Sequence, residues 1–286
     1  MSWILNSFLS AFFTSAKSAL SKKSLESLDE YTVSWFIRFL SFVFILPMFL
    51  FLPIPELGRD FWWVMLLNGI LGAVATVLYS RAMMKSDLSV IAPIATFDSV
   101  ILIITSYIIL GEMPSINGLI GVLLIAAGTY FLNLSQKKNG RMAPIKVLFE
   151  DEGARLMMIA VIIWSLTSSY DKIGIRNSSP VFWSLAMNAS MMVILLPVSY
   201  RKMIEKRREV RRQSKNLILI GIAAVLMIVT NMVAISQSLV VYVISVKKTS
   251  ILMSIIFGRL MFNERNISER LLGGVIMIVG VLLITI

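Results

Sequence analysis

Two adjacent lysines stand inside an apolar stretch of the chain and could bind an anion there. The stretch "YVISVKKTSILMS" runs from Tyr242 to Ser254 and contains Lys247 and Lys248, with apolar residues on both sides. A charge at the centre of a bilayer costs about 2.5 kcal/mol or more, so charges kept there are candidates for a functional role. Because neighbouring side chains on a helix point about 100° apart, one lysine can face a cavity while the other pairs elsewhere. The pair predicts an anion-binding site or, alternatively, an internally neutralised structural charge.

Polar residues on both sides of a predicted symmetry axis extend this candidate site. Thr249 and Ser250 follow the lysines and add hydroxyl groups, and we expect Lys248, at about midplane depth, to meet the substrate anion. Asp98, in "PIATFDSVILII", is the acid that we interpret as lying deepest in an apolar helix, and we expect it to pair with one of the two adjacent lysines. Such a buried pair is costly to break and adds little net stability while intact. A substrate anion or a proton on Asp98 would compete for the same lysine, which makes Asp98 a candidate for coupling.

Three further polar residues lie within apolar segments. Arg38, in "WFIRFL", either binds a carboxylate or phosphate in bidentate geometry or reaches the lipid headgroups. Asn188 occupies the position equivalent to Arg38 in the second half of the chain, and Asn231 lies in an apolar segment further on. Lipid cannot satisfy amide hydrogen bonds, so these side chains should face protein or water.

Aromatic side chains could form the apolar walls of a cavity. Trp164, about ten residues into its predicted helix, and Tyr79 are the candidates for substrate contact. Tryptophans at helix ends more often anchor a protein at the membrane surface. We assign that anchoring role to Trp35, Trp62, Trp63 and Trp183.

The composition identifies the class of protein. Over 286 residues, 57% are hydrophobic and 15% are charged, with a mean hydropathy of +0.83. Soluble domains contain roughly 25% charged residues, so this chain lacks the polar surface that they need. It contains no cysteine and no histidine, which excludes disulfides, cysteine metal sites and histidine-based catalysis. We therefore predict neither an enzyme nor a resident cofactor or metal. The net charge of +11 does not indicate a nucleic-acid partner, because the basic residues concentrate in short loops.

Ten apolar segments are long enough to cross a bilayer about 30 Å thick. They are Trp3–Leu20, Thr32–Leu52, Phe61–Met83, Leu88–Leu110, Ile116–Leu134, Ala154–Ile173, Val181–Tyr200, Leu217–Ser238, Val240–Met261 and Glu269–Ile286. The sequence thus predicts an all-α membrane protein with ten transmembrane helices.

The two halves of the chain match each other at a nearly constant offset. The matching pairs are Lys22/Lys172, Ser34/Ser184 and Pro47/Pro197 at 150 residues, and Gly69/Gly221, Ser86/Ser238, Glu112/Glu264, Gly121/Gly273 and Gly128/Gly280 at 152 residues. We expect a first repeat over 1–134, a loop over 135–153 and a second repeat over 154–286. Five helices per repeat is an odd number, so the second repeat enters the membrane inverted, as in many transporters that bind substrate near the midplane.

Basic residues favour one side of the membrane. They concentrate in alternate loops, above all in Arg201–Lys215, whereas the opposite loops contain Arg59, Lys172 and Arg176. Basic loops usually stay in the cytoplasm. The charge distribution therefore predicts that both termini lie outside.

Three segments carry a resemblance to a known family. The segments "SWFIRFLSFVFILP", "IILGEMPSINGLIGVLLIAAGTYFL" and "SVKKTSILMSIIFGRLMFNERNISERLLGGVIMIVGVLLI" resemble EamA-type transporters of the drug/metabolite transporter superfamily, and the resemblance extends over both halves. It implies ten helices around a central cavity, lined mainly by helices 1–4 and 6–9, with helices 5 and 10 at the periphery. Members export or exchange amino acids, sugars, nucleotide sugars and similar metabolites. A related sugar-phosphate and nucleotide-sugar branch has a basic pair in helix 9, where Lys247 and Lys248 stand. These families usually keep both termini in the cytoplasm, whereas the charge distribution of this chain predicts both termini outside.

We therefore predict a secondary transporter, an exporter or exchanger of a small organic metabolite that is anionic or zwitterionic. Its place would be the cell (inner) membrane, as a multi-pass protein, with a homodimer possible through the glycine-lined helices 5 and 10. Two alternatives remain at this point: a flippase for a lipid-linked sugar or a phospholipid headgroup, and a non-transporting membrane scaffold. A flippase would need lipid and a laterally open cavity, whereas a scaffold would tolerate the loss of Lys248.

Overall fold

The computed structural model describes residues 2–25, 27–86, 94–134, 151–253 and 271–285. Most of the predicted inter-repeat loop lies outside these residues, as do Glu264, the beginning of the fourth predicted helix and the end of the ninth. Every regular element in the described residues is a helix.

The elements of the first half are separated from those of the second by the undescribed segment 135–150. The first half contains α1 (Ser2–Leu25), α2 (Glu30–Ile45), η1 (Leu46–Leu50), α3 (Phe61–Lys85), η2 (Ala95–Phe97), α5 (Asp98–Leu110) and α6 (Ile116–Leu134). The second half contains α8 (Glu152–Arg176), α9 (Pro180–Glu205), α10 (Arg207–Arg212), α11 (Ser214–Gln237), α12 (Val240–Lys247) and α14 (Leu271–Thr285).

Side-chain caps set where several helices begin. Asp29 accepts hydrogen bonds from the backbone N–H groups of Tyr31 and Thr32 at the start of α2. Ser179 accepts one from Phe182 at the start of α9, where Pro180 occupies the first helical position. The first N–H groups of a helix have no partner within it, so these oxygens satisfy donors that burial would otherwise strand.

Five helices are long and apolar enough to cross a membrane in the described part of the chain. They span Glu30–Leu50, Phe61–Tyr79, Glu152–Arg176, Pro180–Glu205 and Ser214–Gln237. Shorter apolar helices cover Ala95–Leu110, Ile116–Leu132 and Gly273–Thr285. The all-α membrane class is therefore confirmed, while the count of ten spans stays a prediction.

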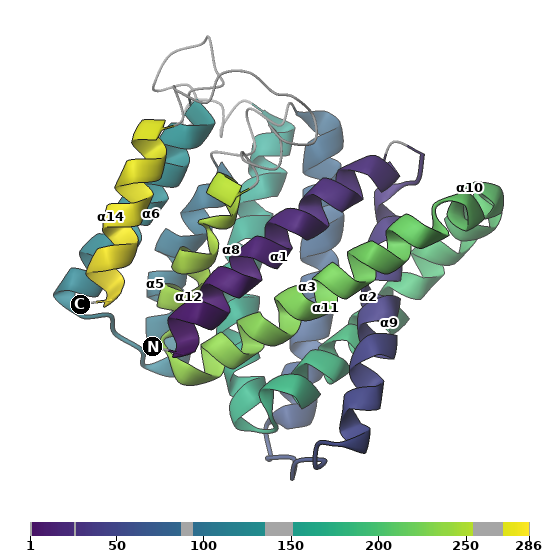
Figure 1. Cartoon of the computed structure of the whole chain (residues 1–286), viewed down its shortest axis with the longest axis horizontal. Coiled ribbons are helices and arrows are strands. Elements are labelled where there is room, and N and C mark those ends of the chain that lie inside the picture. The colour runs from purple at the N-terminus through teal and green to yellow at the C-terminus, as the bar shows by residue number, and fades with distance from the viewer. Residues whose placement is uncertain (1, 26, 87–93, 135–150, 254–270, 286) are drawn as a thin grey trace.

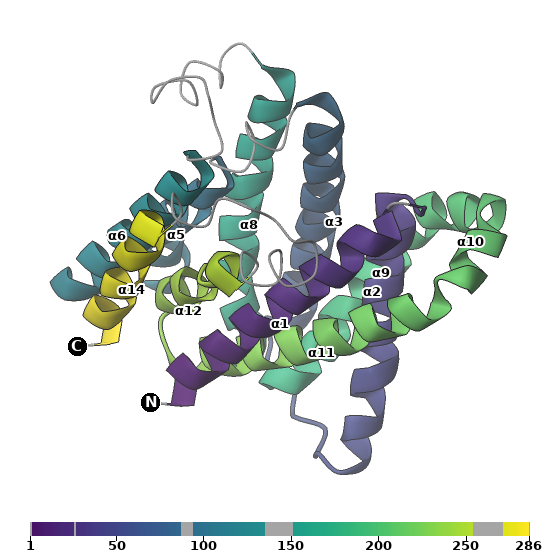
Figure 2. The same ribbon diagram turned by 45° about the horizontal axis from the view of Figure 1, so that its top comes forward.

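The helices pack in pairs that respect the predicted repeat. The most extensive contacts join α6 to α14, α1 to α11, α3 to α8 and α2 to α9, and Figures 1 and 2 show α14 beside α6 and α1 beside α11. If the halves are exchanged, α1 replaces α8 and α11 replaces α3, so the second and third of these pairs map onto each other. The other two pairs each join equivalent helices. This is the packing that an internal two-fold axis produces.

The glycine stripes of α6 and α14 face each other within one chain. A Cβ atom added at Gly121 would lie 2.6 Å from the carbonyl oxygen of Gly280, and one added at Gly128 would lie 2.6 Å from that of Gly273. Small residues let helices approach closely in lipid, where van der Waals packing holds them together. Dimerisation through these same helices would have to use other faces, and it stays a prediction.

Two helices are interrupted at equivalent positions. Residues 95–97 form the 3₁₀ turn η2 just before α5, and α12 ends at Lys247, 152 residues after Ala95. Beyond that point, Lys248 and Thr249 donate their backbone N–H groups three residues back, to Ser245 and Val246. The prediction of one continuous ninth helix was therefore wrong. Interrupted helices in transporters characteristically surround the substrate site.

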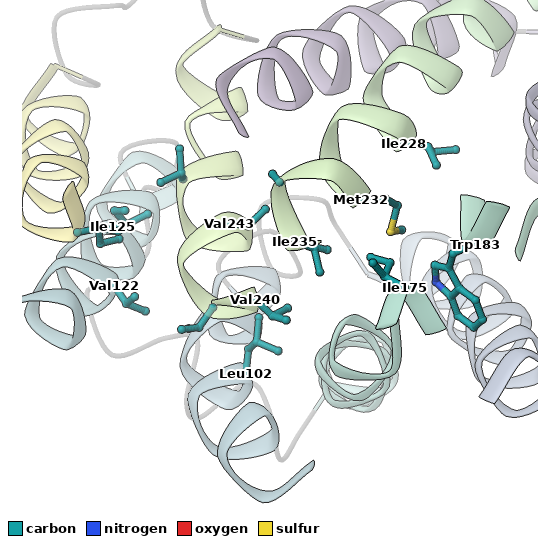
Figure 3. Close-up of a cluster of buried hydrophobic side chains, with 14 of the residues drawn as sticks. Leu102, Val122, Ile125, Ile175, Trp183, Ile228, Met232, Ile235, Val240 and Val243 are labelled. Atoms are coloured by element: carbon teal, nitrogen blue, oxygen red, sulfur yellow. The ribbon is translucent and has the colours of Figure 1, made fainter. Parts of the chain in front are cut away.

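A continuous apolar core joins the repeats. Figure 3 shows Leu102 of α5, Ile175 of α8, Met232 of α11 and Val240 of α12 in one cluster with Trp183 of α9. The indole of Trp183 is fully buried and lies against Gly174, where an added Cβ would approach its ring within 2.3 Å. The membrane-surface role expected of Trp183 was therefore wrong.

Candidate functional site

A central cavity of about 480 Å³ lies between the two repeats. Its walls come from α1, α2, α5, α8, α11 and α12, and the segment after α12 closes one side. The described lining contains four basic residues and two acidic ones: Lys17, Arg38, Lys247, Lys248, Asp98 and Asp171. With all six ionised, the cavity would hold a net charge of +2, from four positive and two negative groups.

Lys248 is neutralised across the repeat axis. Its Nζ lies 2.8 Å from Asp98 Oδ1 and 3.2 Å from the carbonyl oxygen of Ala95, to which it donates. The two side chains of the pair are only 19% and 15% exposed. Both acceptors lie at the turn η2, since Ala95 begins this turn and Asp98 directly follows it. The structure thus brings Lys248 and Asp98 together at the two helix interruptions.

Lys247 and Lys17 have no such neutralising neighbour. Neither makes an ion pair or a side-chain hydrogen bond with any described residue, although both line the cavity. Arg38 has one long contact, 3.5 Å from its Nη1 to Asn188 Oδ1, which joins two equivalent positions of the repeats. Three cations therefore share the cavity without a bound counter-ion among the described residues.

Asp171 is held rigidly on the cavity wall. Its Oδ1 accepts hydrogen bonds from Asn68 Nδ2 at 2.8 Å and from Trp183 Nε1 at 2.9 Å. α8 continues to Arg176, so Asp171 lies more than a turn before the end of this helix.

A smaller chamber of about 150 Å³ adjoins the cavity. The cavity and the chamber share six lining residues: Arg38, Trp164, Thr167, Asp171, Ile228 and Met232. The rest of the chamber wall includes Asn68, Asn188 and the side chains of Met187 and Met191. The two spaces therefore meet at a wall that includes Arg38 and Asp171.

A second cluster of buried charges lies outside both spaces. Glu112 follows the left-handed Gly111 that ends α5, forms an ion pair with Lys172 of α8, and lies 3.4 Å from Arg176 Nη2. The other carboxylate oxygen of Glu112 accepts from the backbone N–H of Val240 at 3.1 Å. Lys172 also donates to the carbonyl oxygen of Ser238, at 2.6 Å. This Glu112 cluster joins the first repeat to the second.

Comparisons with known proteins identify the family. The chain matches the EamA-like transporter family over residues 1–134 and again over 152–286. It belongs to this family. A solved crystal structure matches with a TM-score of 0.76 at 15% identity, covering 99% of this chain and 96% of the other, which shows a shared fold. A search of curated proteins found no match. EamA proteins are membrane transporters of small molecules, so the chain is a multi-pass membrane protein of a transporter family.

In this EamA fold, several residues singled out in the sequence line the two spaces. Trp164 lines both, Asn231 and Ser250 line the cavity, and Asn188 lines the chamber. Asn231 Oδ1 is buried and has no hydrogen-bond partner among the described residues, whereas buried polar atoms are usually paired.

Two residues singled out in the sequence lie elsewhere. Thr249 is buried, and its hydroxyl donates to the carbonyl oxygen of Val246 at 2.7 Å. Tyr79 packs behind Trp164, with the ring centroids 5.4 Å apart. Neither residue lines the cavity or the chamber, so Tyr79 supports the wall through Trp164.

Sequence reasoning missed three residues of this EamA site. Lys17 and Asp171 are charges inside or beside apolar segments, and that signal was visible in the sequence. Asn68 was not recognised, because a single amide in the apolar α3 is not distinguishable from a packing residue without its neighbour Asp171. In the described residues no cluster of three metal-binding side chains occurs.

Proposed function

We propose that this EamA protein is a secondary transporter that exports or exchanges a small anionic metabolite by alternating access around the central cavity. The observation that supports this proposal is the surplus of positive charge on the cavity wall, where four basic residues face two acidic ones and Lys17, Arg38 and Lys247 form no ion pair with a described residue. Uncompensated buried charge is costly, so it is retained where a ligand compensates it. Its proposed location is the cell (inner) membrane.

Lys247 is the residue that we assign to the substrate anion. The sequence favoured Lys248, but Lys248 already has Asp98 at 2.8 Å. A substrate would have to displace that carboxylate before it could bind Lys248. Lys247 faces the same cavity and forms no ion pair with a described residue, so an anion can make a charge-assisted contact there without displacing a paired carboxylate.

The Lys248–Asp98 pair is then suited to coupling. It joins the interrupted helices of the two repeats, and a second anionic group or a proton on Asp98 would weaken it. Weakening this pair would loosen one contact between the halves, which must move relative to each other during alternating access.

An uptake screen in proteoliposomes tests the proposed function. Mono- and dianionic metabolites, zwitterions and neutral analogues of similar size are offered to the wild type, to Lys247→Met and to Lys85→Met, which alters an exposed lysine paired with Glu152. We expect uptake of one or more anions, lost in Lys247→Met and retained in Lys85→Met. Transport restricted to neutral compounds, or equal in the two variants, would contradict the proposal. Lipid scrambling without metabolite uptake would favour a flippase.

A further inference from the structure

Asn68, on α3, is a buried amide with one unused end. Its side chain is 1% exposed, and its Nδ2 donates to Asp171 Oδ1 at 2.8 Å. A carboxylate without a proton only accepts hydrogen bonds, so this contact fixes which end of the amide is nitrogen. The Oδ1 atom is then turned away from Asp171 and has no hydrogen-bond partner among the described residues. Buried acceptors in folded proteins are nearly always satisfied.

Asp171 also has one unused acceptor. The hydrogen bonds from Asn68 Nδ2 and Trp183 Nε1 both reach Oδ1. Oδ2 receives no hydrogen bond and no ion pair from the described part of the chain. Because Trp183 is fully buried against Gly174, its hydrogen bond holds the carboxylate of Asp171, a residue of the cavity wall, and leaves Oδ2 available as an acceptor.

Asn68 and Asp171 line the small chamber together. Gly72, one turn along α3 from Asn68, leaves room beside Met191, since an added Cβ would lie 3.2 Å from the Met191 Cε atom. Met187 and Met191 form an apolar wall that follows the shape of a ligand easily. The chamber thus offers two directed acceptors and an adaptable apolar surface.

We propose that Asn68 and Asp171 form an acceptor subsite for a hydroxyl group of the transported anion, an inference that rests on the proposed function. The anionic end lies at Lys247 and Lys17 in the cavity, and the hydroxyl end passes Arg38 into the chamber. An ammonium group would be attracted by Asp171 but repelled by Arg38, which lines the same small space, whereas a neutral hydroxyl can donate a hydrogen bond without that repulsion. The substrate class is a small hydroxylated phosphate or carboxylate.

Three probes with the same three-carbon chain test this assignment on the purified full-length protein in nanodiscs. They are propyl phosphate, 3-hydroxypropyl phosphate and 3-aminopropyl phosphate, and their affinities are measured by calorimetry. We expect all three to bind the wild type, with the hydroxyl compound tighter than propyl phosphate by about 3- to 10-fold, the effect of one hydrogen bond to a buried group. Equal affinities of these two, or tighter binding of the amine, would overturn the subsite.

Two variants then locate the preference. In Asn68→Leu the ratio of the affinities for 3-hydroxypropyl phosphate and propyl phosphate should fall to about one. Asn188→Ala removes the contact to Arg38 and should weaken the binding of all three probes while keeping this ratio. A preference that persists in Asn68→Leu would show that other residues cause it. If Asn68→Leu does not fold, the ratio of the two affinities in the wild type still tests the hydroxyl subsite. Failure of propyl phosphate itself to bind would instead refute the anion site, and the subsite with it.

Discussion

Lys172 and Lys247 are both lysines enclosed between helices, but their surroundings are opposite. Lys172 is 9% exposed in its side chain and contacts Glu112 and the Ser238 carbonyl. Lys247 faces the central cavity and has neither an ion pair nor a side-chain hydrogen bond among the described residues. The first arrangement satisfies every charge from within the protein. The second leaves the ammonium group of Lys247 available to a ligand that enters the cavity.

This contrast separates charges that hold the fold from charges that bind. A buried ion pair contributes little net stability, yet losing one partner is costly because the other is then stranded. An uncompensated cation is costly already, so removing it should cost nothing or stabilise the protein. Stability and ligand binding should therefore respond in opposite ways at the two lysines.

The largest effect is expected at the Glu112 cluster. Glu112→Gln would leave Lys172 without its counter-ion and should lower the free energy of unfolding by about 3–5 kcal/mol. Thermal unfolding of the purified variant in nanodiscs measures this. Combining Glu112→Gln with Lys172→Met should recover part of the loss. A single variant as stable as the wild type would show that this cluster does not hold the repeats together.

The Lys248–Asp98 pair should show an intermediate effect. Asp98→Asn strands Lys248, but the pair borders the cavity and water can reach it, so the loss should be smaller than that of Glu112→Gln. The double variant Asp98→Asn with Lys248→Met should be more stable than Asp98→Asn alone. Unfolding temperatures of the four proteins complete a double-mutant cycle, and an additive cycle would mean that the two side chains do not interact.

The smallest effect is expected outside the membrane, at Asp151. Hydrogen bonds from the Ser86 hydroxyl and the Ala154 backbone N–H lower the pKa of this carboxyl below its ordinary value. A lowered pKa means that the stabilisation is complete above the ordinary carboxyl pKa of about 3.9 and is lost as pH falls through the lowered value. The unfolding temperatures of wild type and Asp151→Asn should differ slightly at pH 7 and converge below pH about 4. A constant difference from pH 7 to pH 3 would rule out this cap as the cause.

The sequence alone predicted the class, the family and the general packing of the helices. Hydropathy depends only on local composition. The repeat is visible in the offset that pairs Gly121 with Gly273 and Gly128 with Gly280. The same offset pairs the position of Ala95 with that of Lys247, where both helices are interrupted. The interruptions themselves were not predicted, because the apolar runs on both sides of each one indicated a single continuous helix.

The details of the site depended on those interruptions and on neighbours far away in sequence. The break after Lys247 determines that Ser250 lines the cavity and that Thr249 turns to the backbone. The partners of Asp171 could not be predicted, because Asn68 and Trp183 come from two other helices, α3 and α9. The orientation in the membrane stays a prediction from the loop charges.

Thermal unfolding of Lys247→Met, with and without the anion identified in the uptake screen, is the decisive experiment. We predict that Lys247→Met unfolds at the same temperature as the wild type or higher, and that the anion no longer stabilises it. Loss of one charge-assisted contact should weaken binding by about 10- to 150-fold, equivalent to about 1.5–3 kcal/mol. Lys85→Met should match the wild type in both respects. A Lys247→Met protein that unfolds earlier, yet is stabilised by the anion as strongly as the wild type, would show that Lys247 supports the fold and that the cavity binds its substrate by other means.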